Sequence, residues 1–245
     1  MKKILVLSGK GGVGKSTVAV NIAYALAIKG YKVGLLDSDI HGPTIPKLLG
    51  LENVSGLEVE NNKLKPIEVD GVKVVSIGFF LPSRDVPVIW RGPMKHKFLE
   101  QLFNDVNWGN IDYLIIDCPP GTGDEVISVT QLAKPEVAIV VTTPQSVALE
   151  DVRKAVNFAK KANMKIFIIE NMSGLRCPYC GNVIYVFSKG GGESLAREMD
   201  VKFLGSIPLD PNIMESGEAG KPFVKEESET TKVFVEVVER MLDEI

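Results

Sequence analysis

Short apolar runs alternate along the chain with longer stretches in which apolar residues recur at helical spacing. Apolar runs of about four to eight residues are typical of buried strands, whereas apolar residues three or four positions apart indicate a helix with one packed face. Val18, Ile22 and Leu26 predict a helix that ends near Gly30. The predicted strands cover residues 3–7, 32–36, 113–116, 136–141, 165–169 and 203–207.

Two more helices complete this alternation, one over about 147–161 and one near the end of the chain, where Val233, Phe234 and Val237 share a face. Because strands separated by helices need crossover connections, the pattern predicts an α/β fold with a mainly parallel, doubly wound sheet flanked by helices. Residues 52–90 break the rhythm and predict a small β insertion. We expect residues 1–245 to form a single domain.

Composition and charge exclude several classes of function. The net charge of −3 gives no support to indiscriminate nucleic-acid binding, which needs a basic surface. The longest apolar runs fall far short of the ~18 residues that span a bilayer, and the polar side of the last helix is acidic, unlike that of a membrane-surface helix. Three cysteines do not make a secreted disulfide framework. A cytoplasmic protein without membrane or nucleic-acid partners is therefore expected.

The stretch Gly9–Ser16, GKGGVGKS, fits the phosphate-binding pattern G-x-x-x-x-G-K-[ST] between a predicted strand and a predicted helix. Its glycines let backbone N–H groups turn toward phosphate oxygens, and the helix N-terminus adds partial positive charge. Lys15 is expected to reach the β- and γ-phosphates, and the Ser16 hydroxyl to bind Mg²⁺. The predicted nucleotide-binding residues are Gly11, Gly12, Val13, Gly14, Lys15, Ser16 and Thr17.

Lys10 adds a lysine that an ordinary loop of this kind does not require. The sequence GKGGVGKST resembles the deviant Walker A loop of the SIMIBI class of P-loop NTPases, which includes MinD, ParA, the arsenical pump ATPase and the nitrogenase iron protein. The resemblance implies that Lys10 reaches across a homodimer to the partner's nucleotide. A solvated surface lysine is the simpler alternative.

Acidic residues follow two of the predicted strands. Asp37 and Asp39 end one of them, and this stretch resembles the first switch of the group, which implies that Asp39 positions the attacking water and that Asp37 lies nearer the metal. Asp117 ends an apolar strand in a Walker B pattern and is expected to hold Mg²⁺. Simple helix caps would also explain the paired aspartates.

The base is expected to be adenine. Guanine-selective proteins often carry N-K-x-D, and the nearest string, Asn62–Lys65, lacks the acid. Resemblance to the same group implies adenine contacts at Asn171, Pro208 and Asp210, although ordinary turn chemistry would explain these residues equally well. ATP is therefore the predicted nucleotide.

Cys177 and Cys180 stand in the stretch RCPYCGN, followed by an apolar run over 183–187 that predicts a strand. A redox pair of the glutaredoxin type would need its first thiol at a helix N-terminus, and an inert turn is a second alternative. The third is a metal knuckle, in which Cys-x-x-Cys-Gly bends two thiolates onto one ion. Two thiolates are half of a tetrahedral zinc or [4Fe–4S] site, and a two-fold dimer would supply the other half.

In order along the chain, GKGGVGKST, DSDIHGPTIP, VIWRGPMKHKF, YLIIDCPPGTGDE, CPYCG and GSIPLDPNI resemble the Mrp/ApbC family of iron–sulfur cluster carrier ATPases. The resemblance implies that Cys177 and Cys180 bind a bridging cluster and that the protein delivers clusters to apoproteins. We therefore expect a homodimeric, slow Mg²⁺-dependent ATPase coupled to cluster binding or transfer, with zinc possible in aerobic preparations. A MinD/ParA-type positioning ATPase and a zinc-clasped regulatory dimer remain alternatives.

Overall fold

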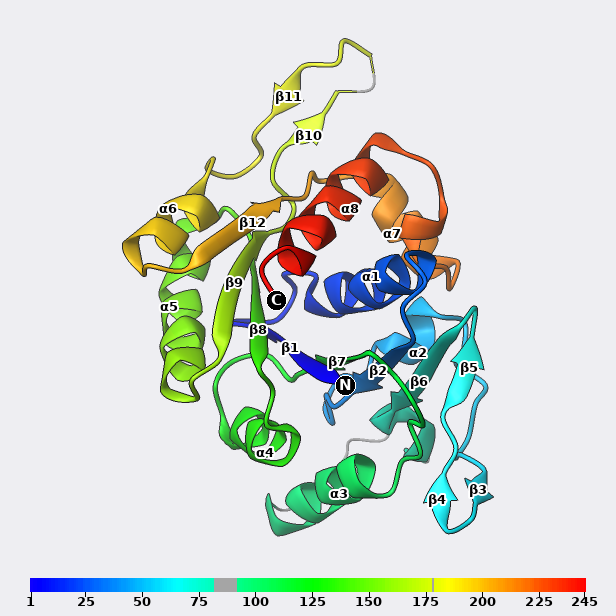
Figure 1. The fold of residues 1–245 in the computed structure, drawn as a ribbon. Coiled ribbons are helices and arrows are strands. Elements are labelled where there is room, and N and C mark those ends of the chain that lie inside the picture. The colour runs from blue at the N-terminus through cyan, green and yellow to red at the C-terminus, as the bar shows by residue number, and fades with distance from the viewer. Residues whose placement is uncertain (82–91, 178) are drawn as a thin grey trace.

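The computed structural model describes residues 1–81, 92–177 and 179–245 (Figure 1). Its centre is an eight-stranded sheet in the order β12-β9-β8-β1-β7-β2-β6-β5, in which only β5 runs antiparallel to its neighbour. The mainly parallel, doubly wound sheet predicted from the sequence is thus confirmed. The strands are β1 (Lys2–Ser8), β2 (Val33–Asp37), β5 (Ile67–Val69), β6 (Val72–Ser76), β7 (Tyr113–Asp117), β8 (Val137–Thr142), β9 (Lys165–Glu170) and β12 (Lys202–Ser206).

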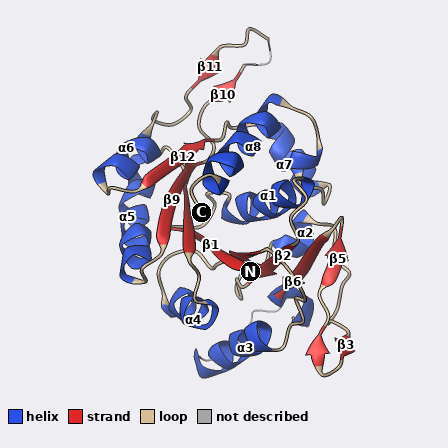
Figure 2. Ribbon diagram, viewed as in Figure 1, coloured by secondary structure: helices blue, strands red, loops and turns tan. Residues whose placement is uncertain are grey.

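Helices cover both faces of this sheet (Figure 2). Alternate residues of β1 pack into two cores, with Ile4 and Val6 on the side of α1 and α8, and Leu5 and Leu7 on the side of α3 to α6. Strands buried on both faces explain the near-continuous apolar runs of the sequence. The helices are α1 (Lys15–Ile28), α2 (Ile45–Leu48), α3 (Gly92–Asn104), α4 (Asp124–Ala133), α5 (Ser146–Lys161), α6 (Gly191–Glu198), α7 (Pro211–Glu218) and α8 (Glu229–Leu242), with 3₁₀ turns η1 (Ile77–Phe80) and η2 (Phe223–Lys225).

The segment predicted as a β insertion contains short strands, as expected, but two of them, β5 and β6, belong to the main sheet. A small hairpin joins β3 (Val59–Glu60) to β4 (Lys63–Leu64) through Asn61 and Asn62, whose positive φ angles of 52° and 60° suit a tight hairpin turn. Strand β6 instead pairs in parallel with β2, because its valines are buried between the two cores. Residues 82–90 of the predicted insertion lie outside the described residues.

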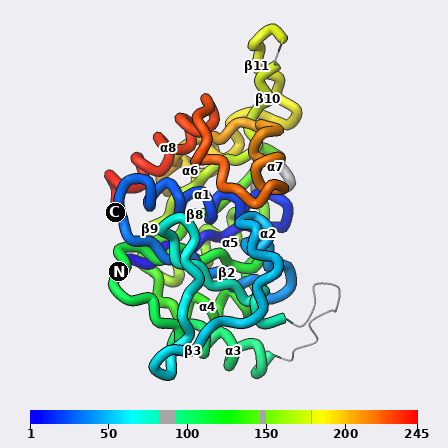
Figure 3. Tube along the Cα trace, turned by 90° about the vertical axis from the view of Figure 1, so that its right-hand side faces the viewer, coloured from blue at the N-terminus to red at the C-terminus, as the bar shows by residue number. Residues whose placement is uncertain are grey.

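A second hairpin, of β10 (Leu175–Arg176) and β11 (Val183–Ile184), projects from the body of the molecule in both Figure 1 and Figure 3. The strand predicted over 183–187 is present but shorter, and the apolar residues from Val183 to Val186 are largely exposed. None of the helices within the described ranges combines the length and apolar character that crossing a membrane requires. That the whole chain is one domain stays a prediction.

Candidate functional site

The loop between β1 and α1 lies at the carboxyl edge of the sheet, where strands of α/β proteins commonly present their ligand sites. It has the strand–loop–helix context that the phosphate-binding motif requires. Gly14 precedes α1 with a φ of 82°, and a Cβ there would lie 2.2 Å from the Asn171 amide nitrogen. That nitrogen donates to the Val13 carbonyl oxygen at 3.0 Å. The close approach of Asn171 explains why a glycine is needed at position 14.

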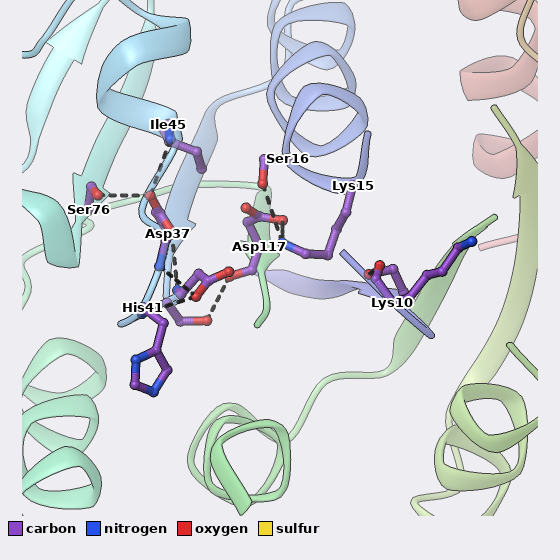
Figure 4. A network of polar contacts seen from close by, with 12 residues as sticks. Lys10, Lys15, Ser16, Asp37, His41, Ile45, Ser76 and Asp117 are labelled. Atoms are coloured by element: carbon purple, nitrogen blue, oxygen red, sulfur yellow. Dashed lines mark hydrogen bonds and ion pairs between the residues drawn. The ribbon is translucent and has the colours of Figure 1, made fainter. Parts of the chain in front are cut away.

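Lys15 forms an ion pair with Asp117 inside the protein (Figure 4). Its Nζ lies 2.7 Å from Asp117 Oδ1 and 3.3 Å from Ser16 Oγ, and the two charged side chains are 7% and 0% exposed. Burial alone would lower the pKa of Lys15, but the nearby carboxylates of Asp117 and Asp39 outweigh burial and raise it. The lysine of the loop is therefore held fully charged at the Walker B strand.

Asp37 and Asp39 play different parts at the end of β2. The Asp37 carboxylate is fully buried and accepts hydrogen bonds from Ser76 Oγ at 2.9 Å and from the Ile45 N–H at 3.3 Å (Figure 4). Asp39 Oδ1 accepts the N–H groups of His41 at 3.2 Å and Gly42 at 3.1 Å. Asp39 also lines the pocket beside the phosphate-binding loop. Asp37 is thus a buried anchor, and Asp39 faces the space that a nucleotide would occupy.

The buried acidic side chains of Asp37 and Asp117 fit a site for a divalent cation. Asp117 Oδ2 is buried and has no hydrogen-bond partner among the described residues. Complete burial and the charge of Asp117 raise the pKa of Asp37 to about 8, which marks a local excess of negative charge. Oxygen ligands of this kind suit Mg²⁺. Binding of Mg²⁺ by Ser16, Asp37 and Asp117, as predicted, fits this arrangement and stays a prediction.

A pocket of about 640 Å³ runs from the phosphate-binding loop to α7. It brings together most of the predicted nucleotide-binding residues, since Asn171, Pro208 and Asp210 line it with the loop. Val13 is buried instead. The lining includes Lys10, Gly11, Gly12, Gly14, Lys15, Ser16, Thr17 and Asp39.

Two of the predicted adenine contacts also serve the local fold. The Asp210 carboxylate caps α7 by accepting the Asn212 N–H at 3.0 Å, and it accepts a second hydrogen bond from Thr230 Oγ1 at 2.6 Å. The Asn171 amide is engaged by the phosphate-binding loop. Asn171 and Asp210 therefore form part of the pocket wall. Base recognition by these residues stays a prediction.

Lys10 points away from Lys15 and Asp117 (Figure 4). Its Nζ donates to Gln145 Oε1 at 3.1 Å, just ahead of α5. Gln145 was not predicted from the sequence, because it follows β8 without any motif. The reach of Lys10 into a partner subunit stays a prediction, and within one chain the Lys10 amine is bound by Gln145.

A polar cluster beside Asp39 was also missed. His41 Nε2 lies 3.0 Å from Glu125 Oε1, and Lys95 Nζ contacts the same oxygen at 2.5 Å. These residues join the loop after β2 to the first turn of α4 and to α3. Nothing in their sequence spacing, 41, 95 and 125, indicates the contact.

Cys177 and Cys180 lie at the tip of the β10–β11 hairpin, outside the nucleotide pocket. The Cys177 N–H donates to the Asn182 carbonyl at 2.8 Å, the Gly181 N–H donates to the Cys177 carbonyl at 2.9 Å, and Gly181 has a φ of 74°. No helix begins among the described residues around this pair, 175–177 and 179–184, so the redox alternative lacks the helix N-terminus that it needs. The turn at Gly181 is compact, and metal binding by the two cysteines stays a prediction.

The environment of Cys177 favours its thiolate. Hydrogen bonds from the backbone N–H groups of Cys180 and Tyr179, and from the Cys180 thiol, lower the pKa of Cys177. Within the described part of the chain, no group of three or more His, Cys, Asp or Glu residues could hold a metal ion. Cys118 is completely buried next to Asp117 and forms no such group with the hairpin cysteines among the described residues. One chain therefore offers two thiol ligands.

Comparisons with known proteins identify the family of this chain. A family model described as "ParA: NUBPL iron-transfer P-loop NTPase" matches residues 1–242. The iron–sulfur cluster carrier protein of Methanocaldococcus jannaschii is 48% identical over 246 residues, which cover 99% of this chain and 84% of that protein.

Two solved structures have the same fold. A nucleotide-binding protein from Archaeoglobus fulgidus, in complex with ADP, is 38% identical with a TM-score of 0.80, over 92% of this chain and 89% of that one. The septum site-determining protein MinD of Pyrococcus horikoshii, complexed with Mg-ADP, is 28% identical with a TM-score of 0.72, over 98% of this chain and 95% of that one. With a family model that spans nearly its whole length, this chain belongs to the ParA/NUBPL family of iron-transfer P-loop NTPases.

Proposed function

We propose that two copies of this chain form a cytoplasmic Mg²⁺-dependent ATPase, which holds one [4Fe–4S] cluster between its cysteine pairs and transfers it to apoproteins. The observation that carries the proposal is an incomplete ligand set on an exposed hairpin. Cys177 and Cys180 supply two sulfur ligands, and a [4Fe–4S] cluster usually takes four. A two-fold axis at the hairpin tip supplies the rest.

The nucleotide site supports hydrolysis of ATP by these residues. Lys15, charged and fixed by Asp117, offsets negative charge on the transferring phosphoryl group. Asp39 faces the same pocket and is the candidate that orients the attacking water. Mg²⁺, held by Ser16, Asp37 and Asp117, would neutralise charge on the β- and γ-phosphate oxygens. Slow hydrolysis is expected, because in this proposal Lys10 reaches the nucleotide of the partner subunit only once the dimer has formed.

The exposed position of the cysteines suits a cargo that is handed on. Cys180 is exposed and Cys177 partly so, whereas a permanent cofactor is commonly enclosed by protein. The name of the M. jannaschii relative, an iron–sulfur cluster carrier, supports the same role. Apo iron–sulfur proteins would be the recipients.

The MinD-type alternative rests on the structural likeness to MinD. A positioning role of the MinD type gives the cysteine pair no function. The acidic polar face of α8 also argues against binding to a membrane surface. A zinc-clasped dimer uses the same thiolates and differs only in the inorganic occupant. Iron, sulfide and zinc analysis separates these alternatives.

Anaerobic reconstitution with iron and sulfide tests the proposal. We expect four iron and four sulfide per dimer, and a dimeric mass by light scattering that depends on the cluster. Cys177→Ala should abolish cluster binding and leave ATP binding intact. Lys15→Ala should abolish ATP binding and cluster transfer. A monomer that binds the full cluster, or a C177A protein that retains it, would refute the shared site.

A further inference from the structure

The segment from Asn171 to Leu175, here called the linker segment, connects the nucleotide pocket to the cysteine hairpin. At its first residue, the Asn171 side chain donates to the Val13 carbonyl in the phosphate-binding loop, and the Asn171 N–H donates to the Thr142 carbonyl at 2.7 Å. Met172 follows with a φ of 58°, which is uncommon for a residue with a side chain, and lines the pocket. The linker segment therefore begins inside the nucleotide site.

A buried carboxylate anchors the middle of the linker segment. Glu170 is fully buried, and its Oε1 accepts hydrogen bonds from Ser173 Oγ at 2.6 Å and Ser206 Oγ at 3.3 Å. Its Oε2 accepts the Gly192 N–H at 2.7 Å, at the start of α6. All three of these donors are neutral groups. Since a buried carboxylate is tolerated only where such hydrogen bonds compensate it, Glu170 is a fixed point for Ser173.

The far end of the linker segment is joined to the opposite wall of the pocket. The Ser173 N–H donates to the Ile207 carbonyl, and the Leu209 N–H donates to the Gly174 carbonyl, each at 2.9 Å. Leu175 forms a parallel bridge with Leu209. Because residues 208–210 line the pocket, β10 is bonded on one side to the pocket wall and on the other to β11.

The base of the β10–β11 hairpin is tightly packed. Gly174 has a φ of 76°, and a Cβ there would lie 2.8 Å from Val183 Cγ1 on β11. The two strands pair from Leu175 with Ile184 to Arg176 with Val183, one residue before Cys177. A displacement of the linker segment is therefore passed to the cysteine loop rather than absorbed at the hairpin base. In Figure 3 the hairpin stands beyond α7, whose first turn borders the pocket.

We propose that the linker segment, held at the Ser173–Glu170 hydrogen bond, transmits nucleotide occupancy to Cys177 and Cys180. Nucleotide in the pocket contacts both supports of β10, the 171–172 stretch and the 208–210 stretch, and so biases the position of the thiols. Ser173 is a positioning residue in this scheme, and it does not line the nucleotide pocket. The inference rests on the proposed function and describes how that function is regulated.

The test measures the reactivity of the thiols in the full-length protein without any bound cluster. Labelling of Cys177 and Cys180 by a maleimide is followed by peptide mass spectrometry, with and without Mg·ADP or a non-hydrolysable ATP analogue. Cys118 is buried and is scored separately. Nucleotide should change the labelling rate in the wild type by about fivefold or more, the lower range of typical allosteric coupling.

The ratio of the labelling rates with and without nucleotide should fall to about one in Ser173→Ala, while the affinity for nucleotide is unchanged. Ser206→Ala is the matched control, because it removes a hydrogen bond to the same carboxylate oxygen from outside the linker segment. Ser206→Ala and the conservative Ser173→Thr should keep the wild-type ratio. The inference is overturned if S173A keeps the full ratio, if S206A loses as much as S173A, or if the wild type does not respond to nucleotide. Cluster reconstitution without nucleotide tests the proposed function separately, so the two failures are distinguishable.

Discussion

Asp37 and Asp117 lie opposite each other at the carboxyl ends of β2 and β7, in register on neighbouring strands and with both side chains fully buried. Lys15 forms its ion pair with Asp117, and Asp37 receives hydrogen bonds from neutral groups. Two buried carboxylates thus share one lysine. This arrangement favours a cation in the site and makes the cation-free protein sensitive to pH.

The cation-free protein should become less stable as the pH rises from about 4 to 8. The pKa of Asp37 is about 8 in the folded protein, against 3.8 for an unperturbed carboxyl. Between these values the folded state binds a proton that the unfolded state has lost, so the unfolding free energy falls with increasing pH and levels off above 8. The steepest slope from one proton is about 1.4 kcal/mol per pH unit.

Urea unfolding from pH 5 to 8, without Mg²⁺ or nucleotide, measures this slope. Asp37→Asn removes the titrating group, and the difference between the two profiles isolates its contribution. We expect a flatter profile for D37N. Parallel profiles for both proteins would show that Asp37 is ionised at neutral pH.

The ion pair between Lys15 and Asp117 should be far more costly to break than an exposed one. Lys15→Met leaves a buried carboxylate without its partner, for which about 3–5 kcal/mol of lost stability is typical. The double variant Lys15→Met with Asp117→Asn should recover most of that loss and still fail to bind nucleotide. Lys29→Met is the control, since Lys29 pairs with Glu239 at the surface, where about 0–1 kcal/mol is expected. Chemical denaturation of the four proteins measures the difference, and a small loss in K15M would contradict a tight internal pair.

Two glycines of the phosphate-binding loop should respond differently to alanine. At Gly14 the φ of 82° and the Asn171 amide 2.2 Å from a Cβ position predict strain and a clash. At Gly11 a Cβ would meet no protein atom within 4 Å. Gly14→Ala should therefore lose about 2 kcal/mol or more of stability, and Gly11→Ala less than about 0.5 kcal/mol.

Gly11 nevertheless lines the pocket, so G11A should weaken nucleotide binding in a protein of normal stability. Thermal unfolding and titration with a fluorescent ATP analogue measure the two effects. Equal losses of stability in both variants would mean that the loop rearranges more freely than its backbone angles indicate.

Sequence and structure agree most closely where the signal is local. The buried strands and the phosphate-binding loop are read from contiguous residues, and Gly14, Lys15 and Ser16 occupy the turn that the motif predicts. The turn that begins at Cys177 is likewise local, because the Gly181 N–H donates to the Cys177 carbonyl, and metal binding there stays a prediction.

The rest of the site depends on contacts between distant segments. Ser76 supports Asp37 only because β6 adds to the sheet beside β2. The sequence predicts an insertion here, because residues 52–90 break the alternation of strands and helices. Glu170 ends an apolar strand without a motif, so neither its burial nor its hydrogen bond to Ser173 could be predicted. The order of strands decides such contacts, and hydrophobic periodicity does not encode that order.

Glu125 should influence catalysis through the loop that carries Asp39. Asp39 Oδ1 is bound by the N–H groups of His41 and Gly42, and the His41 ring in turn contacts Glu125. Glu125→Ala frees the loop from α4 and should lower kcat by about fivefold, equivalent to the ~1 kcal/mol of one net hydrogen bond. The KM for ATP should be unchanged, because Glu125 does not line the nucleotide pocket.

Steady-state ATPase kinetics separate the two parameters, and Glu193→Ala is the control. Glu193 is also in the first turn of a helix, α6, and pairs with Arg197 at the exposed surface, so its loss should leave both parameters unchanged. Glu125→Gln keeps one oxygen acceptor for Lys95 and His41 and should fall between the wild type and E125A. A rise in KM with constant kcat would mean that Glu125 acts on nucleotide binding, and equal kinetics for E125A and wild type would mean that the loop holds Asp39 without α4.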